Sequence, residues 1–212
     1  MKKQIKGLFN SNLNIFTHDF FFKKLIKNDC LILLYHDVSD NPSEFHEQNN
    51  LNVSIKTFEN QLDFLQKYYN FISPLDLLNG KFTRPAAMIT FDDGIKTNFD
   101  IAIKILIQKN ISSLHFLNYS PIIGNFFYSG LVNYLYDKKI LKDYSFLTVP
   151  ENIVHKFLSN KALLKKVFKY HGPFANENDL RNFENNDLVF YGNHLYNHYN
   201  VSNISRDFFT YN

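Results

Sequence analysis

Uninterrupted apolar runs are the clearest feature of the hydrophobic pattern. One run extends from Cys30 to Tyr35 and a second from Ala86 to Phe91. Runs of this length without polar alternation are typical of strands that are buried on both faces of a parallel sheet. Shorter strands are predicted at Phe71-Ile72, Ile111–Leu117 and Leu188–Tyr191.

Helical spacing follows in the stretches between these strands. A helix that begins at Thr57 carries an apolar face made of Phe58, Leu62, Leu65 and Tyr69. The polar residues 39–52 before it are predicted to form a loop. Strand and helix therefore alternate, and this order favours the parallel α/β class.

Capping residues predict two further helical segments. Pro74 to Leu78 has the pattern of a helical turn, which Asn79-Gly80 closes. Thr97 can cap a helix that continues to Asn110, with Asp100 three residues later as an imperfect capping box.

The alternation of strand and helix stops in the second half of the chain. We interpret residues 126–185 as a helical insertion in a single domain, residues 29–212, with residues 1–28 as an N-terminal extension. Within the insertion, helices are predicted at Leu131–Ile140, near Pro150 and at Asn160–Tyr170.

Composition and charge narrow the function classes. Hydrophobic residues make up 45% of the chain and aromatic residues 17%, which predicts a well-packed interior. The net charge is only +3, and the sequence has no run of five or more basic residues, so a nucleic-acid partner is not expected. Cys30 is the single cysteine and is expected to be a buried structural thiol.

The N-terminus starts with Met1-Lys2-Lys3, but the apolar stretch that a signal peptide needs does not follow. The run Phe20–Phe22 is too short to span a bilayer. A cytoplasmic location is therefore predicted. The Phe- and Lys-rich N-terminal segment could still contact a membrane surface or a partner.

Two acidic residues follow the second long strand. Asp92 and Asp93 come directly before Gly94, where the missing Cβ allows the chain to turn sharply. Ligands of parallel α/β proteins bind at the carboxyl ends of strands. Two close carboxylates repel unless a cation neutralises them, so one can ligate a metal while the other acts as a base. The alternative is a polar turn in which one of them caps the next helix.

Two histidines follow the last predicted strand. His194 and His198 are four residues apart, so on a helical turn they would lie on one face and could bind one divalent ion. The alternative is a pair of ordinary surface or hydrogen-bonded histidines. One Asp and two His ligands leave a fourth position for water, as in catalytic zinc sites. Water bound there can attack a carbonyl while the other carboxylate takes its proton.

These segments resemble a known family. Thr90-Phe91-Asp92-Asp93-Gly94 is similar to the first signature motif of the polysaccharide deacetylase family, also called the NodB-homology or carbohydrate esterase 4 family. His194 and His198 resemble its second motif, His-Ser/Thr-x-x-His. Tyr35-His36 and Ile111–Phe116 fit the family's framing strands, and the likeness extends from about Cys30 to the C-terminus.

The resemblance implies a distorted (β/α) barrel and a hydrolase that removes acetyl groups from an N- or O-acetylated sugar or polysaccharide. Asp92 would be the catalytic base. Asp93, His194 and His198 would hold the metal, zinc or another divalent ion such as cobalt or nickel, whose bound water is the nucleophile. His36 is a candidate substrate-binding residue, with a packed, hydrogen-bonded histidine as its alternative.

The chain departs from the family pattern in three places. Leu195 stands where the second motif has Ser or Thr, and Ile95 follows Gly94 where members usually have Tyr. The later family motifs, which carry an Arg and a His that acts as general acid, do not occur before Asn212. We therefore expect a barrel that is incomplete at its C-terminal end.

Three explanations stay open for the missing later motifs. The sequence is a fragment, or a variant whose site a partner chain completes, or a catalytically silent member of the family. A silent member would act as a carbohydrate-binding or assembly protein. A hydrolase of a different amide on the same scaffold is a further alternative. The oligomeric state has no signal in the sequence.

Overall fold

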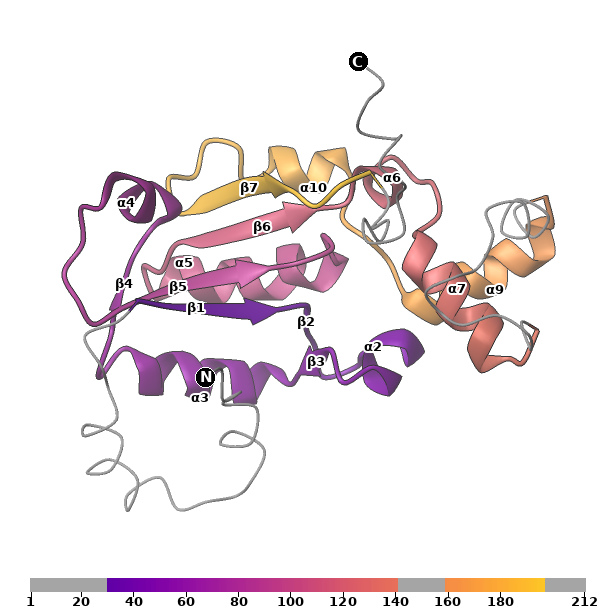
Figure 1. The fold of residues 1–212 in the computed structure, drawn as a ribbon, viewed down its shortest axis with the longest axis horizontal. Coiled ribbons are helices and arrows are strands. Elements are labelled where there is room, and N and C mark those ends of the chain that lie inside the picture. Colours follow the sequence, from indigo (N-terminus) through magenta and orange to yellow (C-terminus); the bar gives the residue numbers. More distant parts are fainter. Residues whose placement is uncertain (1–29, 141–158, 197–212) are drawn as a thin grey trace, which may run out of the picture.

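A parallel sheet organises the protein (Figure 1). The computed structural model describes residues 30–140 and 159–196. The sheet is five-stranded, and its main path is β1-β5-β6-β7, with β4 also pairing with β5. The strands are β1 (Cys30–Tyr35), β4 (Asn70–Phe71), β5 (Ala86–Phe91), β6 (Ser113–Leu117) and β7 (Val189–Asn193).

Every pair in this sheet is parallel, so the predicted parallel α/β class is confirmed. A short separate pair, β2 (Asp37–Val38) with β3 (Asn52–Val53), is also parallel. Among the described residues the sheet is open, with β1 and β7 at the ends of its main path. Closure into a barrel stays a prediction.

Helices α3 (Ile55–Leu65) and α5 (Ile103–Gln108) cover one face of the sheet (Figure 1). Ser54 caps α3 by accepting a hydrogen bond from the Thr57 backbone N–H. The apolar face predicted for α3 is confirmed, because Phe58 and Leu62 are fully buried against the sheet. The predicted helical turn is also present as α4 (Pro74–Asn79), which ends at Gly80 in a left-handed conformation with φ 64°.

Three local predictions were wrong. The strand Cys30–Tyr35 is buried on one face only, because Ile32 is 59% and Leu34 53% exposed. The segment predicted as a loop contains α2 (Glu44–Gln48), capped by Ser43, which is too short to show helical periodicity in the sequence. Thr97 does not cap the next helix, which starts as the π-helical segment η1 (Asn98–Ala102). Its hydroxyl instead donates a hydrogen bond to the carboxylate of Asp37, which is 1% exposed and would be costly to bury without donors.

The described helices of the insertion are α7 (Tyr128–Asp137), α9 (Lys161–His171) and α10 (Glu177–Arg181), and the short helix α6 (Tyr119–Ile122) precedes them. Helices α7 and α9 of the insertion lie beyond the carboxyl ends of the strands, whereas α10 lies behind β7 (Figure 1). Helices α7, α9 and α2 share a core that includes Phe45, Leu131 and Tyr170. The predicted helices near 131–140 and 160–170 are thus present, and the one near Pro150 lies outside the described residues. Across the described residues, no helix combines the length and apolar character needed to cross a membrane.

The division into buried and exposed leucines gives a direct test of this core. We predict that Leu62→Ala lowers the free energy of unfolding by about 2–5 kcal/mol, because it opens a cavity under the sheet. The same change at Leu78, which is 81% exposed, should alter stability by less than about 0.5 kcal/mol. Urea denaturation of both variants measures the difference. Equal losses would show that α3 does not pack as described.

Candidate active site

The turn after β5 holds the backbone in an uncommon conformation. The N–H of Asp92 donates to the carbonyl of Tyr35 at 3.0 Å, which extends the pairing with β1. The N–H of Gly94 then donates to the Asp92 carbonyl at 3.0 Å, while Asp93 has φ 71° and Gly94 φ 80°. Positive φ is unfavourable at Asp93, and such strain concentrates at functional sites.

The Asp93 side chain points into the protein, where Asn118 orients it. Asp93 is only 3% exposed. Its Oδ1 accepts a hydrogen bond of 2.9 Å from the amide of Asn118, which directly follows β6. Asn118 was not among the residues selected from the sequence. The signal in the sequence was that Asn118 is a polar residue immediately after a predicted strand, as Asp92 is.

His194 meets the acidic pair from the end of β7. Its N–H donates to the Leu117 carbonyl at 3.0 Å, which continues the β6–β7 pairing. Its Nε2 lies 3.6 Å from Asp93 Oδ1 and 3.8 Å from Asp92 Oδ2. Three of the four residues predicted as catalytic base or metal ligands are therefore brought together, from two segments far apart in the sequence.

The spacing of Asp93 and His194 fits a shared divalent ion. Two ligand atoms at zinc distances in a tetrahedral site lie about 3.4 Å apart, close to the observed 3.6 Å between Asp93 Oδ1 and His194 Nε2. Within residues 30–140 and 159–196, no group of three or more His, Cys, Asp and Glu side chains is arranged to hold a metal. The third predicted ligand, His198, lies outside those residues.

The backbone after His194 differs from the helical turn that the sequence predicts. Leu195 has φ 69°, so the chain leaves His194 through a left-handed turn and not through a right-handed helical one. A right-handed helical turn therefore does not continue from His194 through Leu195, and the position of His198 lies outside the described residues.

The return of the insertion fixes the segment that follows the acidic turn. Ala175 N–H donates to the Gly94 carbonyl at 2.9 Å, and Lys96 N–H donates to the Pro173 carbonyl at 3.1 Å. The Lys96 ammonium is hydrogen-bonded to Asp179, and this contact raises the pKa of Lys96. Residues 173–179 of the insertion thus hold the acidic turn in place through these hydrogen bonds.

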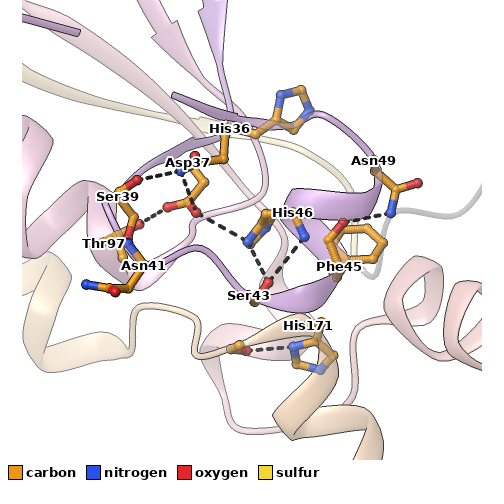
Figure 2. A network of polar contacts seen from close by, with 12 residues as sticks. His36, Asp37, Ser39, Asn41, Ser43, Phe45, His46, Asn49, Thr97 and His171 are labelled. Carbon is orange, nitrogen blue, oxygen red and sulfur yellow. Dashed lines mark hydrogen bonds and ion pairs between the residues drawn. The ribbon is translucent and has the colours of Figure 1, made fainter. Parts of the chain in front are cut away.

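A buried polar network holds the same segment from the β1 side (Figure 2). The carboxylate of Asp37 accepts hydrogen bonds from Thr97 and, at 3.3 Å, from Asn52. His46 Nδ1 lies 3.6 Å from Asp37 Oδ2 and shares a 2.9 Å hydrogen bond with Ser43. Burial lowers the pKa of His46 even though the nearby carboxylates of Asp37 and Asp93 oppose that shift. We take His46 as neutral, since desolvation outweighs an ion pair of this length.

His36 stands at the same edge of the sheet but apart from this network. Its ring points away from Asp37 and His46 (Figure 2), while its backbone carbonyl accepts a 2.7 Å hydrogen bond from Asn98. A substrate-binding role for His36 stays a prediction. His115, on β6, is a core residue: it is 1% exposed and stacks on Phe91 at 4.7 Å.

Two further histidines are buried in neutral form. Burial lowers the pKa of His171 from 6.5 to about 4 and that of His115 to about 3. His171 Nδ1 donates to the Gly172 carbonyl at 2.6 Å, and its ring packs closely on Gly130 of α7. His115 packs beside the sheet against Phe91 and Phe99, whereas His171 packs within the insertion against Phe127 and Phe174.

Comparisons with known proteins give a distant likeness. No family model matches the sequence, and a search of curated proteins found no match. Among solved structures, the chain is similar to IcaB from Ammonifex degensii, with 18% identity, a TM-score of 0.49, and coverage of 80% of this chain and 53% of that one.

A de-N-acetylase from Aggregatibacter actinomycetemcomitans follows with 21% identity, a TM-score of 0.47, and coverage of 78% of this chain and 54% of the other. The Streptococcus pyogenes deacetylase PplD, solved with acetate, has 17% identity, a TM-score of 0.46, and coverage of 84% and 62%. The chain thus spans a little over half the length of these proteins. Two other solved structures that the chain resembles, BC0361 from Bacillus cereus and BA0330 from Bacillus anthracis, carry the name of polysaccharide deacetylase, the family that the sequence motifs resemble. At TM-scores below 0.5 the likeness carries no functional argument, so function has to be inferred from the side chains of this chain.

The buried histidines predict a loss of stability in acid. Between pH 6.5 and about 4, His171 is protonated in the unfolded chain but neutral in the folded one. The unfolded state then binds more protons, so the free energy of unfolding should fall as the pH drops. Denaturation curves at several pH values in this window measure the slope for wild type and His171→Gln. The variant should show a shallower slope, whatever its absolute stability. An unchanged slope would contradict a neutral His171 in the fold.

Proposed function

We propose that this protein is a metal-dependent hydrolase that removes acetyl groups from an N- or O-acetylated glycan. One observation carries the proposal. The Nε2 atom of His194 lies 3.6 Å from one aspartate and 3.8 Å from the other, at the carboxyl edge of a parallel sheet. An imidazole facing two carboxylates is a donor set suited to a divalent cation.

The two aspartates would have different tasks. Asp93 is buried and its Oδ1 is held by the Asn118 amide, so it is suited to ligation in a fixed direction. Asp92 is more open, with a side chain 16% exposed against 4% for Asp93. That exposure lets Asp92 reach a water molecule and take its proton as the water attacks the acetyl carbonyl.

Asp93 and His194 would hold the cation, with His198 proposed as the third ligand from the sequence motif. A divalent ion bound there supplies water of lowered pKa and polarises the acetyl carbonyl. The acetylated glycan as substrate rests on the resemblance of the two motifs to the polysaccharide deacetylase family. The buttressed turn around Asp93 keeps both carboxylates in place as the reaction proceeds.

Metal uptake is the first test. Wild-type protein loaded with Zn²⁺ or Co²⁺ and dialysed should retain about one ion per chain by elemental analysis. His194→Ala and Asp93→Ala should each lower the affinity at least tenfold, because each removes a ligand. His36→Ala should retain the ion, since it has no place in the predicted ligand set. Wild-type protein that takes up no divalent ion would refute the proposed site.

Acetate release is the second test. With acetylated chito-oligosaccharides, Asp92→Asn should lower the rate by about 10²–10⁴-fold while it retains the metal, because an amide cannot accept the proton. Asp63→Asn is the matched control: this carboxylate is 56% exposed on α3, and its loss should leave the rate unchanged.

The outcomes separate the proposal from its alternatives. Bound metal and bound glycan without release of acetate would indicate a catalytically silent carbohydrate-binding protein. Release of a different acyl group would indicate a hydrolase of another amide. An active Asp92→Asn variant would remove Asp92 from the role of base.

A further inference from the structure

Four exposed apolar side chains gather beside the candidate site. Tyr119 is 57% exposed, Tyr196 56%, Ile123 47% and Leu195 45%. They come from two segments, α6 and the turn that follows β7. We call this group the aromatic notch. None of the four side chains carries a charge, so the surface that they expose is largely apolar.

Backbone hydrogen bonds join the two halves of the notch. Tyr119 N–H donates to the Leu195 carbonyl at 3.2 Å, and Ser120 N–H donates to the Tyr196 carbonyl at 2.6 Å. The rings of Tyr119 and Tyr196 have centroids 5.8 Å apart and an interplanar angle of 47°. The backbone segments that carry the two rings are therefore joined to each other, and neither side chain is needed for the hydrogen bonds that connect them.

The notch borders the proposed catalytic groups through its own chain neighbours. Tyr119 follows Asn118, whose amide contacts Asp93. Tyr196 is two residues beyond His194. Helix α6 lies at the carboxyl ends of β6 and β7, the edge at which the acidic turn also lies (Figure 1). A ligand that reaches Asp92 and His194 would have the notch directly beside it.

The chemistry of the notch fits a sugar ring. Exposing several large apolar side chains together is unfavourable, and such a patch next to polar groups marks a ligand surface. Tyrosine combines an apolar ring face with a hydroxyl that can make hydrogen bonds. A pyranose has the matching form, with C–H groups on its faces and hydroxyls around its rim. Its faces can pack on the rings while its hydroxyls remain in water or bond to the tyrosine hydroxyls.

We propose that the aromatic notch binds a pyranose ring of the glycan next to the sugar that presents its acetyl group to Asp92 and His194. This assignment builds on the proposed function but is tested by binding alone. The notch would then fix the register of a chain substrate, and longer oligosaccharides would bind better than a single acetylated sugar.

The absence of tryptophan from the sequence allows a direct test. Tyr119→Trp and Tyr196→Trp each introduce one fluorophore at the notch and keep an aromatic face there. Tyr136→Trp is the matched control, because Tyr136 is 54% exposed on α7 in the helical insertion. The full metal-loaded chain is titrated with N-acetylated chito-oligosaccharides, and tryptophan emission is recorded. Both notch reporters should shift to shorter wavelength in a saturable way, and the Tyr136→Trp reporter should not change.

Alanine variants measure the contribution of each ring. Tyr119→Ala and Tyr196→Ala should each weaken oligosaccharide binding about tenfold by calorimetry, while Tyr136→Ala binds as wild type does. Thermal unfolding of all three variants checks that they fold alike. Binding of a single N-acetylated sugar should be much less affected than binding of a tetramer.

Each result bears on the notch separately from catalysis. Reporter shifts without any acetate release would support the notch and count against the proposed deacetylase. Acetate release with silent notch reporters and unchanged alanine variants would overturn the notch and leave the hydrolase intact. No binding of any glycan by the wild type would overturn it as well. A blue shift that depends on protein concentration alone would assign the patch to a second copy of this chain and also overturn the proposal.

Discussion

The parallel register of β5, β6 and β7 is the constraint on which the candidate site depends. Because Phe91 lies opposite His115 and Leu117 opposite Asn193, the three strands end at one edge of the sheet. The residues that follow them, Asp92, Asn118 and His194, must then meet there. The hydrogen bond from Asn118 to Asp93 and the approach of His194 to both carboxylates are consequences of that register. A shift of one residue in β7 would turn His194 away from the edge.

Packing against that edge then fixes the acidic turn. Asp93 takes a positive φ that an aspartate does not favour, and the surroundings must hold it in this conformation. Backbone bonds from Ala175 and Lys96 hold the turn on the insertion side, and Asp37 holds it through Thr97 on the β1 side. The helical insertion therefore has a local structural task, since its return segment supports the proposed catalytic carboxylates.

The proposed hydrolase and the proposed sugar notch use neighbouring parts of the same two segments. The end of β6 supplies Asn118 to orient a carboxylate and Tyr119 to face solvent, and the end of β7 supplies His194 and then Tyr196. Placing polar groups inward and apolar rings outward at successive positions is a natural way to combine chemistry with binding of a chain substrate.

The sequence by itself determined the strands, most of the helices and the candidate acidic pair. The apolar runs at Cys30–Tyr35 and Ala86–Phe91 and the spacing of Phe58 and Leu62 are local signals, and the structure confirms both strands and the buried helix face. Burial on both faces is confirmed only for Ala86–Phe91, because the first strand lies at an end of the main sheet path and exposes Ile32. Only the tertiary structure decided that Asn118 orients Asp93, that Thr97 binds Asp37 and not the helix terminus, and that Leu195 begins a left-handed turn. These features depend on partners far away in the chain. A buried carboxylate needs hydrogen-bond donors, and tertiary packing decides which donors lie near it. No local pattern of residues carries that information.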